Sequence, residues 1–138
     1  MVICEAQLRC IFRDYNDIYF DSQLPLPNFK VIHSFKYFGY FKSDVCYDGR
    51  LIDPTIEISD CYEYSSEQLR DIMVHEMIHY FLAYTGRDVK GSHGSEFHSV
   101  ASRLNEQYKL NITARINEDE YTRRKGSNIF KYALSKLF

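Results

Sequence analysis

Apolar side chains recur every three or four positions in three stretches of the chain, and this spacing predicts three helices. The first helix covers residues 4–20 and carries a single apolar stripe. The second covers residues 66–85 and is apolar on nearly every side, which is typical of a helix in the middle of a domain. The third covers residues 95–108, again with one apolar face.

The limits of the central helix are marked by local signals. Ser65 is followed three residues later by Gln68, which fits a capping box at the helix start. Gly86 fits the position just past the end, where a left-handed backbone conformation is common. The central helix is therefore the best-defined element of the chain.

The segment between the first two helices lacks the helical period and predicts a small three-stranded sheet. The first strand begins at residues 29–32, and the aromatic-rich residues 35–42 form the second, with Gly39 as a bulge. A turn at residues 48–49 precedes the third strand, which residues 55–59 predict by their alternation. The predicted fold class is α+β: a small three-stranded sheet packed with an N-terminal helix, a central helix and a following helix.

The hydrophobic pattern weakens after the third helix. We therefore expect a core domain at residues 1–110 and a C-terminal extension at residues 111–138. The charged runs at residues 118–120 and 123–125 are typical of solvated surface. Residues 128–138 predict a short amphipathic helix.

Composition narrows the class of protein. The 138 residues are 45% hydrophobic and 26% charged, which excludes a disordered chain and suits one globular domain. The sequence has no apolar run long enough to span a membrane, and the net charge of -2 does not support a general nucleic-acid surface. Cys4, Cys10, Cys46 and Cys61 have no C-x-x-C spacing, and the first residues do not fit a secretory signal. We expect reduced thiols and a cytoplasmic protein.

The strongest chemical signal is the H-E-x-x-H motif that His75, Glu76 and His79 form within the central helix. Residues four apart lie on the same helix face, so the two imidazoles can converge on one metal ion, and the glutamate can reach a water in an open position. Imidazole nitrogens suit Zn²⁺. The metzincin continuation of the motif fails, because Leu82 and Thr85 stand where glycine and histidine should be.

A catalytic zinc site needs a third protein ligand. His93 is the favoured candidate, since it has glycines nearby and directly precedes the next helix, where the chain can fold back over the site. Glu96 is the alternative ligand, and His98 competes less well because it sits in the middle of the third helix. His33 lies in the predicted sheet and is interpreted as an ordinary structural histidine.

These residues resemble those of a known family. Residues 10 to 110 resemble the SprT-like zinc metallopeptidases, the group that includes the Spartan DNA–protein crosslink proteases. The matching segments are Tyr15–Phe20 with the following Leu24-Pro25, Phe38–Phe41, the helix through His75–His79, and His93-Gly94-Ser95-Glu96-Phe97, which is similar to the H-G-x-x-F of the family.

The resemblance implies a zincin-like fold in which His75, His79 and His93 bind zinc and Glu76 is catalytic. It also implies a protein or peptide substrate, whereas contact with DNA rests on the resemblance alone. Many SprT-like proteins carry a zinc ribbon after the protease core, but this chain has no cysteine after Cys61. The DNA-directed role is therefore not carried over.

Three functions follow as hypotheses. The first is a zinc-dependent metallopeptidase with Glu76 as general base, in which an extended substrate pairs with an exposed sheet edge at residues 55–59. The second is a non-proteolytic zinc-binding module that holds peptide or DNA. The third is an α+β interaction domain without metal.

Overall fold

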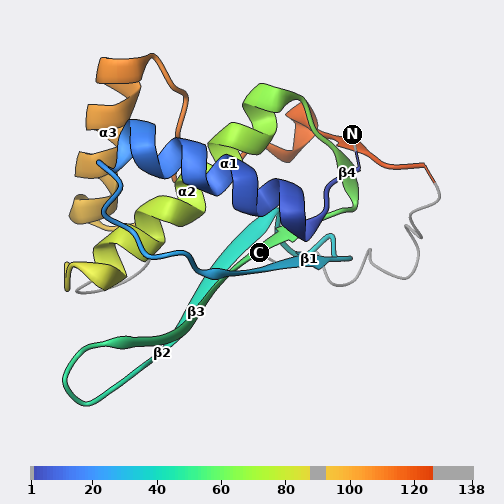
Figure 1. Cartoon of the computed structure of the whole chain (residues 1–138). Coiled ribbons are helices and arrows are strands. Elements are labelled where there is room, and N and C mark those ends of the chain that lie inside the picture. Colours follow the sequence, from blue (N-terminus) through green and yellow to red (C-terminus); the bar gives the residue numbers. More distant parts are fainter. Residues whose placement is uncertain (1, 88–92, 126–138) are drawn as a thin grey trace.

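The computed structural model describes residues 2–87 and 93–125 of the chain (Figure 1). Its elements in order are α1 (Glu5–Tyr19), β1 (Asn28–Ile32), β2 (Gly39–Val45), β3 (Leu51–Ser59), β4 (Tyr62–Glu63), α2 (Ser66–Tyr84), α3 (Ser95–Tyr108), the 3₁₀ helix η1 (Glu118–Glu120) and β5 (Thr122–Arg123). The α+β class and the three helices are confirmed. Within the described ranges, no helix combines the length and apolar character that crossing a membrane would need.

The main sheet has the order β1-β3-β2, with β1 parallel and β2 antiparallel to β3. The prediction that residues 55–59 form an exposed edge is therefore wrong, because β3 lies in the centre. The physical reason is that all five residues of this segment are buried, so their alternation of residue types does not reflect a solvent-facing side. The two edges of the sheet are β1 and β2.

The predicted second strand begins too early. Residues 35–38 precede β2, and the rings of Phe35 and Phe38 pack against Tyr62 at centroid distances of 5.4 and 4.5 Å. Their aromatic character serves this cluster and not strand pairing. Gly39 is not the bulge, because the register of β2 against β3 shifts between Lys42 and Asp44.

The hairpin between β2 and β3 follows the predicted turn. The N–H of Cys46 donates to the carbonyl of Arg50 at 2.8 Å, which closes the turn. Gly49 has a φ of +89°, a conformation that glycine adopts without steric penalty. The hairpin extends away from the helices in Figure 1.

Helix α2 is the centre of the domain. Its predicted capping box is present, since Ser65 Oγ accepts from the Gln68 N–H and Gln68 Oε1 accepts from the Ser65 N–H, both at 3.0 Å. Both α1 and α2 pack on one face of the sheet: Phe12 of α1 contacts Phe29 at 5.5 Å, and Tyr80 of α2 stacks on Phe41 at 5.3 Å. This arrangement fixes α2 beside the edge strand β2.

The chain after α3 returns to the start of α2. Strand β5 pairs antiparallel with β4, and Gln68 Nε2 donates to the carbonyl of Glu120 at 2.9 Å. Asn105 holds Ile112 through two hydrogen bonds of 2.9 and 2.8 Å. The domain boundary at residue 110 stays a prediction, and the helix predicted at 128–138 lies outside the described residues.

Candidate metal centre

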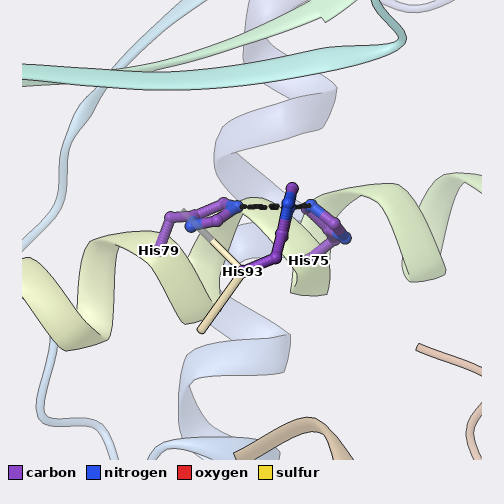
Figure 2. A group of neighbouring side chains, drawn as sticks. All are labelled: His75, His79 and His93. Carbon is purple, nitrogen blue, oxygen red and sulfur yellow. Dashed lines mark hydrogen bonds between the residues drawn. The ribbon is translucent and has the colours of Figure 1, made fainter. Parts of the chain in front are cut away.

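Three imidazoles converge beside the central helix (Figure 2). His75 and His79 lie one turn apart on α2, and His93 lies two residues before α3 begins. The Nε2 atom of His75 is 3.1 Å from that of His93 and 3.3 Å from that of His79, and the remaining pair is 3.2 Å apart. The structure thus places three of the predicted site residues together, with the same ring nitrogen of each pointing at a common centre.

Phe97 of α3 holds the three rings in place. Its ring centroid lies 4.8 Å from that of His75 and 4.9 Å from those of His79 and His93. Phe97 is almost fully buried, so its position is set by the packing of α3 against α2. The apolar ring covers one side of the site.

The orientation of the His75 ring is fixed by a hydrogen bond at Nδ1, the nitrogen that points away from the other two histidines. Its Nδ1–H donates to the backbone carbonyl of Thr113 at 2.8 Å. Because a neutral imidazole carries one proton, this hydrogen bond leaves the Nε2 of His75 as a lone pair aimed at the other two rings. Such an outer hydrogen bond is the usual companion of a metal-binding histidine.

Burial keeps the imidazoles neutral. Desolvation is the main cause that lowers the pKa of His75 to about 4, and the same cause followed by the neighbouring histidines lowers the pKa of His79 to about 3. Desolvation also lowers the pKa of His93. At neutral pH all three rings are therefore in the uncharged form that a metal ligand requires.

The donor set fits zinc. With Zn–N bonds of about 2.0–2.1 Å and tetrahedral angles, two ligating nitrogens lie about 3.3 Å apart. The observed separations of 3.1 to 3.3 Å agree with this value. Three neutral imidazoles also match the ligand number of a catalytic zinc site, which leaves one position for water or substrate.

Glu76 lies between α2 and β2 and is buried. Burial raises the pKa of its carboxyl to about 8, and a hydrogen bond from the backbone of Phe41 opposes this shift. Gly39 packs directly on this side chain: a Cβ there would lie 3.1 Å from both Cγ and Oε2 of Glu76. The carboxyl is therefore confined by the edge strand that runs past it.

The other candidate ligands lie elsewhere. Glu96 Oε2 accepts a hydrogen bond from Arg87 Nε at 3.0 Å, so its carboxylate is engaged in an ion pair. His98 is outside the group of three converging histidines. His33 belongs to a different group with Asp60 and Cys61. The part of the site that sequence reasoning missed is the carbonyl of Thr113, since a backbone acceptor has no residue signature.

Comparison with known proteins agrees with this arrangement. The structure is an α+β domain in which three histidines on and beside the central helix converge in a group that could hold a metal ion. The model of the SprT-like family matches residues 8–117, and the chain belongs to this family. It is thus a module related to the zincin-type metallopeptidases. A search of curated proteins finds no match.

Proposed function

We propose that this chain is a zinc-dependent metallopeptidase in which His75, His79 and His93 bind the metal and Glu76 is the general base. The observation that carries the proposal is the convergence of three Nε2 atoms within 3.1 to 3.3 Å of one another, next in sequence to a buried carboxyl. Zinc held by these three histidines would lower the pKa of a bound water toward about 7 and would polarise the carbonyl of the scissile peptide bond.

In this proposal Glu76 transfers a proton from the attacking water to the leaving amine. As a carboxylate it accepts a proton from the attacking water and returns one to the nitrogen of the leaving amine. The carboxyl group is buried, which raises its pKa, and a zinc ion bound at the adjacent three-histidine centre would favour its ionised form. The hydrogen bond from the Phe41 backbone and the packing of Gly39 hold the carboxyl in one place for this transfer.

Strand β2 is the edge that suits an extended substrate. The N–H of Ser59 donates to the carbonyl of Phe38, and in an antiparallel pair the residues bonded to the partner strand alternate with residues that face away. The backbone N–H and C=O groups of Gly39 and Phe41 therefore point away from β3, toward the free edge of the sheet. Because Gly39 and the backbone of Phe41 contact the side chain of Glu76, a peptide that adds as a strand at this edge would pass close to this carboxyl.

The test is a comparison of zinc-loaded wild type with Glu76→Gln and Glu96→Gln. We expect wild type to cleave an unfolded protein substrate such as casein, and Glu76→Gln to lose about 10²–10⁴-fold in kcat while it retains the metal. Glu96→Gln is the matched control, since Glu96 pairs with Arg87 and should leave cleavage within a few-fold. Elemental analysis and circular dichroism establish metal content and fold.

Two results contradict the proposal. Undiminished cleavage by Glu76→Gln would remove Glu76 from the mechanism. Full zinc content in wild type without cleavage of a broad protein panel, with and without single-stranded DNA, would favour the non-proteolytic zinc module that holds peptide or DNA.

A further inference from the structure

A second group of donor side chains lies where two parallel strands end. Ile32 and Ser59 are register partners at the last positions of β1 and β3, and the N–H of Asp60 donates to the carbonyl of Ile32 at 2.8 Å. His33 follows the first strand, and Asp60 and Cys61 follow the second. Because the strands run in the same direction, these three residues leave the sheet at the same edge.

The donor atoms of Asp60 and Cys61 both lie close to Nδ1 of His33. His33 Nδ1 lies 2.7 Å from Asp60 Oδ1 and 3.5 Å from Cys61 Sγ, and the three atoms lie within 4.8 Å of one another. In a nucleophile–base relay the thiol and the acid contact opposite ring nitrogens. Here the thiol of Cys61 and the carboxylate of Asp60 both lie near Nδ1 of His33. This is the arrangement expected of three ligands around one cation.

The donor types suit a borderline-soft cation. Thiolate, imidazole and carboxylate are all zinc ligands, and bond lengths of about 2.3 Å to sulfur and 2.0–2.1 Å to nitrogen put the two ligands about 3.6 Å apart in tetrahedral geometry. The observed Sγ to Nδ1 distance is 3.5 Å. The 2.7 Å between Nδ1 and Oδ1 is that of a hydrogen bond, so a cation would replace this proton and the His33 ring, whose side chain is 45% exposed, would move slightly.

The surrounding backbone holds the group in position. The N–H of Arg124 donates to the carbonyl of Cys61, and Arg124 Nη1 donates to the carbonyl of Asp60, both at 2.8 Å. The same Nη1 lies 3.5 Å from Asp60 Oδ2, which leaves Oδ1 directed at His33. The positive charge of Arg124 opposes a cation, so we expect weaker binding than at the three-histidine centre.

We propose that His33, Asp60 and Cys61 form a second binding site for Zn²⁺ or Co²⁺ that clips the ends of β1 and β3 together. The site uses none of the residues assigned to the metallopeptidase centre. Its sulfur ligand gives it a spectroscopic signature that a centre made of three histidines lacks.

The test is a Co²⁺ titration of the metal-free 138-residue chain, followed by absorption spectroscopy. We expect thiolate-to-cobalt charge-transfer absorption that develops after the first equivalent has filled the three-histidine centre, reaches its limit at about two equivalents per chain, and is lost in both Cys61→Ser and His33→Ala. His33 is largely exposed, so its variant tests the site even if replacing the buried Cys61 impairs folding. Cys46→Ser, at a half-buried cysteine outside the group, is the matched control and should keep the absorption.

The outcome is independent of the proposed peptidase. His79→Ala removes a ligand of the first centre but should keep the charge-transfer absorption. Absence of this absorption in wild type, or its survival in Cys61→Ser or His33→Ala, would overturn the second site and leave the three-histidine centre untouched.

Discussion

The two clusters of donor side chains each bring three donor atoms within 4.8 Å of one another, but they differ in where the protons lie. In the cluster on α2, the proton of His75 points outward to the carbonyl of Thr113, so the inner nitrogen is a lone pair. In the cluster at the strand ends, the inner nitrogen of His33 carries the proton and donates it to Asp60. The comparison shows that the outer hydrogen-bond partner decides which nitrogen is available: a cation can enter the first cluster directly, whereas at the second it must replace the proton between His33 and Asp60.

The clusters also differ in burial and in what they connect. His75 is 6% exposed in the core, whereas the side chain of His33 is 45% exposed at the sheet edge. A cation at the first centre joins α2 to the chain just before α3, while one at the second joins strands that already pair through their backbones. Metal at the first centre should therefore contribute more to stability.

The largest expected effect is the loss of metal from the three-histidine centre. A ligand that binds only the folded state at 100 to 1,000 times its Kd stabilises by about 3–4 kcal/mol. We therefore expect chelation to lower the melting temperature of wild type by roughly 10 °C. Differential scanning calorimetry of zinc-loaded and chelated protein measures this change.

Matched variants make this comparison specific to one cluster. His75→Ala should lose the response to chelation, whereas His33→Ala and His98→Ala should keep most of it, since neither residue belongs to the first centre. An equal response in His75→Ala would show that the stabilising metal binds elsewhere. A reduced response in His33→Ala alone would assign the stability to the second cluster.

The packing of Gly39 against the carboxyl of Glu76 gives a second way to separate the two regions. An alanine at position 39 would place its Cβ 3.0 Å from Cγ2 of Ile72 and 3.1 Å from Oε2 of Glu76, so the carboxyl must shift. We expect Gly39→Ala to lower kcat by about 10–100-fold with KM and zinc content unchanged, because small misplacements of a catalytic group have effects of this size. Val45→Ala, at the exposed far end of β2, is the control. A change in KM alone would show that Gly39 acts on the substrate and not on Glu76.

The sequence predicted best what depends on neighbouring residues. The capping box of α2 and the turn at Gly49 are local signals and were correct. The four-residue spacing of His75 and His79 on a helix is local too, although their role as zinc ligands stays a prediction. His93 was favoured by its nearby glycines and its place directly before the next helix, and the resemblance to the H-G-x-x-F of the family added to this, whereas periodicity gave no signal for it.

The errors arose where tertiary packing decides the structure. Residues 55–59 were predicted to form an exposed edge, yet β3 is the central strand and its Glu57 is buried, with a hydrogen bond from Tyr37 and an ion pair to Lys42. Residues 35–38 looked like a strand because they are aromatic, yet their rings pack with Tyr62. In both segments, contacts with residues distant in sequence decide the structure. The residues next to each segment in the sequence carry no signal for these contacts.

The smallest expected effect is a pH dependence of the metal-free protein. The folded pKa of Glu76 is raised to about 8, so its contribution to stability is complete below its unfolded pKa near 4.5 and is lost as pH rises through 8. The folded pKa values of His75 and His79 are lowered, so these residues reduce the free energy of unfolding only as pH falls below about 6.5. Between pH 6.5 and 8, Glu76 is therefore the group of the three that changes stability.

Chelated wild type should lose up to about 2 kcal/mol of unfolding free energy between pH 6.5 and 8, and Glu76→Gln should lose none of this amount. Urea unfolding at several pH values measures both. Below pH 6.5 both proteins should become less stable as the histidines of the unfolded chain take up protons, with a steeper fall in Glu76→Gln because the opposing contribution of the glutamate is absent. A wild-type profile that is flat above pH 6.5 would mean that the carboxyl of Glu76 is already ionised without metal, and that its surroundings prepare the base before the cation arrives.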